Sequence, residues 1–379
     1  MLVRNESSAR LFARESEPLA LVCRNMAVRF ERGGRLLAFG NAQCASDAQH
    51  IAVEFMHPVL VGKRALPALD LSASYRESVR AIVRPEDIVV AFGPPAGDAQ
   101  VDAVVRIAMD RGALSLALSG SAGDYAITAP SQDPFVHQEL IEILYHTLWE
   151  TVHVFFERSA LNEGAGAASF LYPFLGDTRD SADEIVPEVA ASIRAKAAAV
   201  QRLRDQIVGT QSGQIADAIS AIRNAIDAGG TVLCFGNGGS ATDATDFALD
   251  LCHSPKGYAR VPAISLASDA ATLTAIANDI GTDALFSRQL IACGRRGDIA
   301  VAFSTSGGSA NIVAALKEAR SRGLVTIAIV GYDGGEVLRR HLADHVIVVN
   351  SDQIPRVQEA QASIYHVMLD LLETRRRLT

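Results

Sequence analysis

Two stretches of the chain, Arg35–Asn41 (RLLAFGN) and Thr231–Asn237 (TVLCFGN), decide the fold. Each is a short apolar run that ends in Gly-Asn, the pattern of a buried strand that leads into a tight turn. The residues that follow also match, because ASDAQH begins at Ala45 and ATDATD begins at Ala241. The chain therefore repeats itself.

The repeat extends to the end of each copy. Gln138-Glu139 recurs as Gln358-Glu359, and His146 recurs as His366. The second copy also carries an insertion, which lies between Ser268 and Asp298. We therefore expect two copies of one domain, divided as residues 1–160, a connector over residues 161–185, and residues 186–379.

Apolar runs alternate with helical segments in both copies. The runs are RLLAFG, ALPALDL, DIVVAFG, LSLALSG and DYAITAP in the first copy, and TVLCFG, AISLAS, IAVAFS, VTIAIVG and VIVVN in the second. Near-continuous apolar strands are typical of parallel sheets covered on both faces. The alternation predicts two doubly wound, flavodoxin-like α/β domains in tandem, each with three α/β/α layers. The helices are expected near residues 134–157, 186–209, 213–228, 240–252, 270–278, 281–290, 308–322 and 355–375.

Composition restricts the class of protein. The 379 residues are 49% hydrophobic and 21% charged, with a net charge of −8 and no dense basic run, which argues against a nucleic-acid or anionic-membrane surface. No apolar stretch has the roughly 20 residues that a membrane span needs, and the first residues contain no apolar signal core. The five cysteines form no CxxC pair, so no disulfide framework or thiolate zinc site is indicated. We expect a cytoplasmic protein.

Two loops of the second copy have the composition of an anion site. Gly236–Ser240 (GNGGS) and Ser304–Ser309 (STSGGS) each follow a strand and open a helix. Small residues let the backbone approach a phosphate, and N–H and hydroxyl groups at a helix N-terminus donate to its oxygens. The alternative is ordinary helix-capping chemistry. Neither loop is GxGxxG or GxxxxGK[ST], so no nucleotide cofactor is expected.

The motifs of the second copy resemble the SIS (sugar isomerase) domain of the phosphoheptose isomerase family. They are FGNGGSATDATDF, ANDIG at 277–281, LFSR at 285–288, STSGGSANI, and IPRVQE at 354–359 with His366. The resemblance covers residues 186–375 and is weaker in the first copy. It implies a phosphate seat made of Ser304, Thr305, Ser306 and Ser309, with a contribution from Ser240. It also implies that Asn237 and Asp279 line the sugar site.

The family also places four residues around a metal, usually zinc, and in the first copy the matching residues are His50, Glu54, Gln138 and His146. His50 and Glu54 share a helix face at i and i+4. Gln138 and His146 project within roughly 80° of each other on one helix. Two imidazoles and a carboxylate suit Zn²⁺. Taken singly, either histidine is more simply interpreted as a helix residue with no metal.

The same four positions in the second copy hold Asp246, Asp250, Gln358 and His366, a shorter and harder set that predicts weaker zinc binding or another ion. Conversely, the first copy replaces the phosphate loop with GPPAGD at 93–98, which lacks hydroxyl donors and adds a carboxylate. Two explanations stay open. Either one active site combines the metal ligands of one copy with the phosphate loop of the other, or both copies have drifted toward binding without much catalysis.

The resemblance implies an aldose–ketose isomerase, acting on sedoheptulose 7-phosphate and a heptose 7-phosphate through an enediol. The reaction needs a base, an acid and stabilisation of the enediolate. Glu54 is the candidate base and His146 the partner acid/base, with His366 as a further catalytic candidate. A metal held at His50 would act as a Lewis acid, and a metal-bound Glu54 would lose basicity, so its two roles compete.

Other functions fit the same motifs. One is a non-catalytic SIS module that senses a sugar phosphate or acts as a scaffold for a partner, and another is isomerisation of an aminosugar phosphate. SIS relatives are commonly dimers of dimers, so the resemblance implies a homodimer of two-domain chains. The expected ligand is a sugar phosphate, with no nucleic-acid or membrane partner.

Overall fold

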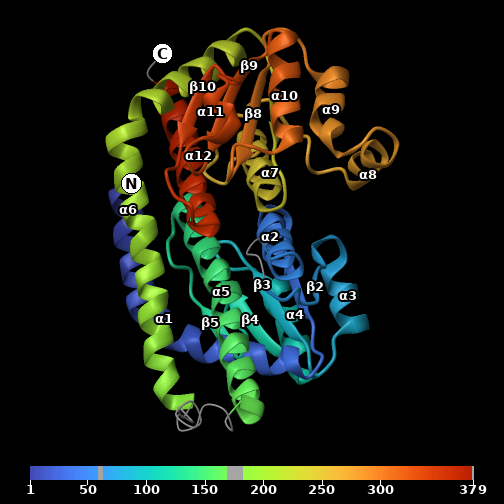
Figure 1. The fold of residues 1–379 in the computed structure, drawn as a ribbon, viewed down its shortest axis with the longest axis vertical. Coiled ribbons are helices and arrows are strands. Elements are labelled where there is room, and N and C mark those ends of the chain that lie inside the picture. Colours follow the sequence, from blue (N-terminus) through green and yellow to red (C-terminus); the bar gives the residue numbers. More distant parts are fainter. Residues whose placement is uncertain (59–62, 169–181, 378–379) are drawn as a thin grey trace. The chain divides into compact units, whose positions relative to one another are not determined.

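The computed structural model describes residues 1–58, 63–168 and 182–377 (Figure 1). The chain divides into two compact units. The N-terminal unit comprises residues 2–132 and 136–199, and the C-terminal unit comprises residues 133–135 and 200–379 with Met1. None of the helices in the described ranges combines the length and the apolarity that crossing a membrane requires.

The N-terminal unit is built on a parallel sheet with the strand order β2-β1-β3-β4-β5. Short 3₁₀ helices at Ala42–Cys44 and Ser72–Ser74 precede α2 and α3. The elements in chain order are α1 (Leu2–Glu31), β1 (Leu36–Gly40), α2 (Ala45–Met56), β2 (Ala68–Asp70), α3 (Tyr75–Ile82), β3 (Ile88–Phe92), α4 (Ala99–Asp110), β4 (Leu114–Leu118), β5 (Tyr125–Ile127) and α5 (Pro134–Ala168).

The C-terminal unit repeats this plan, with the parallel order β10-β9-β8-β6-β7. The two orders correspond strand for strand, and both are flavodoxin-like. This confirms the predicted fold class. The elements are α6 (Ala182–Asp227), β6 (Val232–Phe235), α7 (Gly239–Cys252), β7 (Ala263–Ser265), α8 (Ala270–Asp279), a 3₁₀ helix (Thr282–Ala284), α9 (Leu285–Cys293), β8 (Ile299–Ser304), α10 (Ala310–Ser321), β9 (Val325–Val330), α11 (Gly335–Arg339), β10 (His345–Val348) and α12 (Ile354–Arg377).

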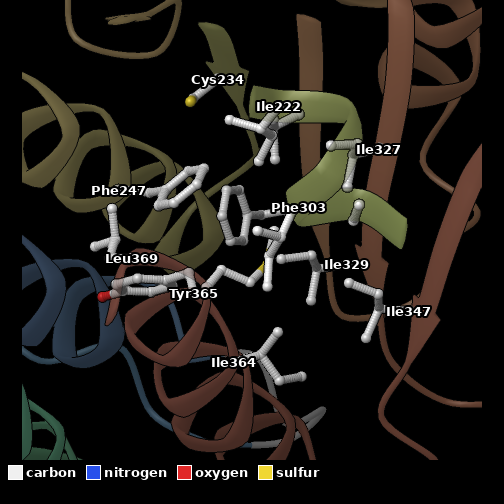
Figure 2. Close-up of a cluster of buried hydrophobic side chains, with 14 of the residues drawn as sticks. Ile222, Cys234, Phe247, Phe303, Ile327, Ile329, Ile347, Ile364, Tyr365 and Leu369 are labelled. Atoms are coloured by element: carbon white, nitrogen blue, oxygen red, sulfur yellow. The ribbon is translucent and has the colours of Figure 1, made fainter. Parts of the chain in front are cut away.

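The central strands of both units, β1, β3 and β4 in one sheet and β6 and β8 in the other, are buried on both faces. In the C-terminal unit, Cys234, Phe303 and Ile327 pack with residues of α6, α7 and α12, as Figure 2 shows in part. Their neighbours Leu233 and Ala302 point the other way and pack with residues of α9 and α10. Because side chains alternate along a strand, each apolar run serves two helix layers. The layers are the predicted α/β/α arrangement.

The N-terminal unit has the same two-sided core. Leu37 and Val89 face α3 and α4. Phe92, on the opposite face of β3, meets Tyr145 of α5 edge to face at 6.0 Å between ring centroids. This contact sets α5 against the sheet, and α5 carries the polar residues described below.

The helix that leads into the second sheet differs from the prediction. The sequence predicts two helices, near 186–209 and 213–228, but α6 runs without a break from Ala182 to Asp227. Gly209 and Gly213 do not interrupt it, because buried Ile207 and Ile215 anchor the helix on either side and tertiary packing outweighs the glycine penalty. Of the predicted connector, residues 169–181 lie outside the described residues.

Equivalent turns end the first strand of each sheet. A Cβ atom at Gly40 would lie 2.2 Å from the carbonyl oxygen of Cys44, and one at Gly236 would lie 2.2 Å from that of Ser240. Only glycine allows the chain to turn this closely into the following helix. In a doubly wound sheet, ligands bind outside the carboxyl ends of the strands where the strand order reverses, which here is between β1 and β3 and between β6 and β8.

Candidate functional site

Helices α2 and α5 bring two buried histidines together in the N-terminal unit. The Nε2 atoms of His50 and His146 lie 3.4 Å apart, and the side chains are 2% and 0% exposed. The hydroxyl of Tyr145 and Nδ1 of His50 are joined by a hydrogen bond of 2.8 Å. Burial, reinforced by the neighbouring His146, holds the pKa of His50 well below its usual range. His50 is therefore a neutral imidazole, the form that binds metals.

Glu54 lies one helical turn beyond His50 on α2. Its Oε1 is 3.8 Å from Nε2 of His50, while its Oε2 is buried without a hydrogen-bond partner among the described residues. Burial, with a smaller contribution from Glu150, raises the pKa of Glu54 to about 8. A carboxyl group with a pKa near neutrality is suited to exchanging protons.

Glu142 is the residue that our sequence analysis missed. Ligand atoms of His50, Glu142 and His146 all lie within 4.8 Å of one another, and all three side chains are buried. Gln138, Glu142 and His146 follow each other at intervals of four on α5 and so share one face. That spacing is visible in the sequence, but the resemblance assigns no role to the position of Glu142.

Gln138 takes a different direction from the other predicted metal ligands. Its Nε2 donates a hydrogen bond of 3.2 Å to Oδ1 of Asp47, and its Oε1 is buried without a partner in the described part of the chain. The structure thus brings His50, His146 and one oxygen of Glu54 close together, adds Glu142, and ties Gln138 to Asp47.

The donors around His50 fit a divalent cation. Two imidazoles and a carboxylate form a borderline-soft ligand set, which Zn²⁺ and neighbouring transition ions accept. The unpartnered oxygens of Glu54 and Gln138 are further acceptors whose burial is costly unless a proton or a cation satisfies them.

The matching histidine of the C-terminal unit has other neighbours. His366 stacks on the ring of Phe135, with centroids 4.5 Å apart and planes inclined by 13°. Its Nε2 lies 3.5 Å from Oδ2 of Asp250. The ammonium group of Lys256 sits 4.4 Å above the same Phe135 ring and pairs with Asp370 at 2.8 Å. His366 therefore has an aromatic ring and a carboxylate as neighbours, rather than a second imidazole.

The other second-copy positions are buried or half-buried. Burial raises the pKa of Asp250, which its hydrogen bond with His366 partly offsets. Asp246 and Gln358 are both buried. Among the described residues, neither Asp246 nor Asp250 belongs to a group of three His, Cys, Asp or Glu ligands within 4.8 Å of one another, as His50 does.

The loop after β8 has the build of an anion site. The hydroxyl oxygens of Ser304 and Ser306 accept hydrogen bonds from the backbone N–H groups of Gly307 (3.0 Å) and Gly308 (3.2 Å). These contacts shape the loop and leave each hydroxyl proton available to a ligand. Ser309 is the N-cap residue of α10, but its side chain accepts no hydrogen bond from the first N–H groups of that helix.

The remaining predicted site residues surround this loop or lie apart from it. Asn237, in the loop after β6, and the unpredicted Asn311, in the first turn of α10, exchange two hydrogen bonds of 2.9 and 2.8 Å. Ser240 is buried in the first turn of α7, and Thr305 is half-buried. Asp279, at the end of α8, is exposed.

The corresponding loop of the N-terminal unit carries its own anion. Oδ1 of Asp98 accepts hydrogen bonds from the backbone N–H groups of Gln100 (2.8 Å) and Val101 (3.2 Å) at the start of α4. Its Oδ2 accepts a hydrogen bond from Nδ2 of Asn41. The carboxylate thus takes the donors that a bound phosphate would use.

Comparison with known proteins places the C-terminal half of the chain in a family. A family model described as SIS domain matches residues 197–331. A phosphoheptose isomerase of Geobacter sp. (strain M21) is 39% identical over 190 residues, covering 50% of this chain and 96% of that protein. A phosphoheptose isomerase of Sulfurimonas denitrificans is 46% identical over 140 residues, 36% of this chain and 70% of that protein.

A solved structure supports the fold over the whole length. The C-terminal domain of glucosamine-fructose-6-phosphate aminotransferase from Francisella tularensis matches 99% of this chain and 96% of its own, with a TM-score of 0.60 and 12% identity. At that identity the likeness concerns the fold alone. The sequence relatives carry the assignment, which falls on the C-terminal half. The chain therefore belongs to the phosphoheptose isomerase family of SIS-domain proteins.

Proposed function

We propose that the chain is an aldose–ketose isomerase that interconverts sedoheptulose 7-phosphate and a heptose 7-phosphate. The observation that carries the proposal is the buried group of His50, His146 and Glu54, which sets acid–base side chains beside a cation-binding donor set. The names of the relatives, phosphoheptose isomerase, supply the substrate class.

The residues of the N-terminal unit perform the proton transfer. Glu54 takes a proton from the carbon next to the carbonyl group and returns it to the neighbouring carbon, because its raised pKa favours exchange in both directions. His146 exchanges a proton with the substrate oxygen. A divalent cation bound by the two histidines would supply Lewis-acid polarisation of the carbonyl and hydroxyl oxygens.

The C-terminal unit binds the phosphate group. The hydroxyls of Ser304 and Ser306 and the N-terminus of α10 donate to its oxygens, with Thr305 and Ser309 completing the loop. Asn237, Ser240 and Asp279 contribute to the sugar site.

An isomerase assay on sedoheptulose 7-phosphate tests the proposal. Glu54→Gln should abolish turnover, and Ser306→Ala should raise KM, whereas Ser321→Ala at the far end of α10 should change neither value. Turnover that survives Glu54→Gln would remove the proposed base. An unchanged KM in Ser306→Ala would remove the proposed phosphate seat.

We further propose zinc as the cation, a homodimer of two-domain chains as the assembly, and the cytoplasm as the compartment. Metal analysis of the purified chain, light scattering after size exclusion, and cell fractionation check these three points in turn.

A second candidate function is a non-catalytic protein that binds sugar phosphates. Two observations favour it, namely the Asp98 carboxylate in the anion loop of the N-terminal unit and the Phe135 ring on His366. Binding of the sugar phosphate with no turnover in the metal-loaded wild-type protein would support this candidate over the isomerase.

A further inference from the structure

Two carboxylates of the N-terminal unit compete for the role of metal ligand. Glu54, on α2, has one oxygen 3.8 Å from Nε2 of His50. Glu142, on α5, has an oxygen within 4.8 Å of ligand atoms of both His50 and His146. Glu54 does not belong to that group of three. Glu142 is thus the carboxylate that converges with both imidazoles.

The position of Glu142 in the repeat strengthens this distinction. The residue that corresponds to it in the second copy is Ala362, which has no ligand atom. The copy that has two histidines facing each other therefore also has the additional carboxylate. The additional carboxylate and the facing pair of histidines thus occur together in one copy and are both missing from the other.

Tyr145 holds one side of the same group. Its hydroxyl is hydrogen bonded to Nδ1 of His50, while Nε2 of that ring faces His146. A hydrogen bond at one imidazole nitrogen fixes which nitrogen is free for a metal and how the ring is turned. Tyr145 thus directs Nε2 of His50 toward the centre of the group.

We propose that Glu142, with His50 and His146, is the carboxylate ligand of a divalent transition ion, and that Tyr145 is a positioning residue acting through His50. The role of the ion in a reaction rests on the proposed isomerase function. The binding of the ion does not depend on that function. A ligand role for Glu142 resolves the competition between the roles of Glu54, because a carboxylate outside the ligand set keeps its basicity.

The test is Zn²⁺ binding by the full chain, stripped with a chelator and titrated against a chromogenic chelator. Glu142→Gln should weaken binding by more than about 100-fold, the upper end for loss of an outer-shell partner, and Tyr145→Phe by about 10- to 100-fold. Glu54→Gln should leave the affinity within a few-fold of wild type. Glu150→Gln, one turn beyond His146 on α5, is the matched control and should also leave it unchanged.

Absorption of the Co²⁺-loaded protein gives a second readout. Its visible spectrum reports the ligand set, so it should change in Glu142→Gln and persist in Glu54→Gln. Glu142→Asp, which keeps the carboxylate, should recover part of the affinity. Circular dichroism identifies any variant that fails to fold. If Glu142→Gln does not fold, the Zn²⁺ affinity of Glu54→Gln still tests the proposal, because a loss of affinity in that variant would make Glu54 a ligand.

The outcomes separate the two proposals. Loss of Zn²⁺ affinity in Glu54→Gln with wild-type affinity in Glu142→Gln would overturn the inference and leave the isomerase intact. Zn²⁺ binding that is no tighter in wild type than in His50→Ala/His146→Ala would overturn the metal centre altogether. Zn²⁺ binding that is lost in Glu142→Gln and kept in Glu54→Gln, in a protein without turnover, would support Glu142 as ligand and reject the isomerase.

Discussion

His146 and His366 hold the same place in two copies of one fold, on the last long helix, and both follow a tyrosine. Around His146 the neighbours are another imidazole and the carboxylate of Glu142. Around His366 they are the Phe135 ring and the carboxylate of Asp250. The comparison teaches that a shared residue at a shared position does not imply shared chemistry, because the side chains that face it set its environment.

The largest expected effect separates the two histidines by activity. Replacing His146 with alanine should lower kcat by about 100- to 10,000-fold, the range for loss of a general acid–base group. His366→Ala should keep kcat within about tenfold of wild type, because its ring is covered by Phe135. Steady-state kinetics measure both values. Equal losses in the two variants would place both histidines in the reaction and erase the contrast.

Phe135→Ala should destabilise the C-terminal unit by about 3–5 kcal/mol, the usual cost of removing a buried phenyl ring. Phe135 is 1% exposed, belongs to the core of that unit, and stacks on His366. Hydrogen exchange of amides in β8 and α12 measures the change. Phe135→Leu keeps apolar volume and should lose much less, so similar losses in both variants would indicate that the aromatic stack matters more than the cavity.

His137 offers a contrast in pH dependence, since its counterpart in the second copy is Val357. Nε2 of His137 donates to the carbonyl oxygen of Gly93 at 3.0 Å, and burial lowers the pKa of His137 from 6.5 to about 4. His137 therefore binds a proton more readily in the unfolded chain than in the folded one. Its contribution to the free energy of unfolding is present above pH 6.5 and is lost as the pH falls toward 4. At about 1.4 kcal/mol per pH unit the loss is roughly 3 kcal/mol.

His137→Val should remove that part of the acid sensitivity. The one tryptophan of the chain, Trp149, is buried in the N-terminal unit and reports its unfolding by fluorescence. Denaturant titrations at pH 7 and pH 4.5 give the difference in stability. An equally steep loss in wild type and variant would show that other groups, such as buried His50, dominate the acid response.

The smallest expected effect on stability concerns the N-termini of α4 and α10. Asp98→Ala should cost about 1 kcal/mol of the stability of the N-terminal unit, because it removes the cap of α4. Ser309→Ala should cost little stability, because Ser309 makes no side-chain cap on α10, but it should weaken phosphate binding. Fluorescence of Trp149 follows the first variant and calorimetry with inorganic phosphate the second. A stability loss in Ser309→Ala as large as that in Asp98→Ala would remove the distinction.

The fold was largely predictable because its signals are local. Apolar runs such as IVVAF and IAVAFS identify buried parallel strands, and the duplicated FGN turn identifies two domains. The break predicted in α6 was wrong, since Gly209 and Gly213 suggested an end that the buried residues on either side do not allow. Propensity is a weak guide where packing decides.

The site was less predictable because its contacts are long-range. The resemblance identifies His50, Glu54 and His146 but not Glu142, although the spacing of Glu142 with His146 is visible in the sequence. The Phe135–His366 stack and the Asn237–Asn311 pair each join residues far apart in sequence. No periodicity or motif in a single chain encodes such pairs, so only the folded structure reveals them.

The Asp98 carboxylate at the start of α4 has a thermodynamic consequence. The N-terminal N–H groups of α4 already donate to Asp98, so added phosphate should not raise the stability of that unit. A helix N-terminus whose N–H groups bind phosphate gains stability as the ligand concentration rises. Heating the protein in phosphate buffer should thus shift the melting of the C-terminal unit upward and leave that of the N-terminal unit where it was. Under the proposed function, the loop before α10 would respond to the concentration of a phosphate ligand, whereas the matching loop before α4 would not.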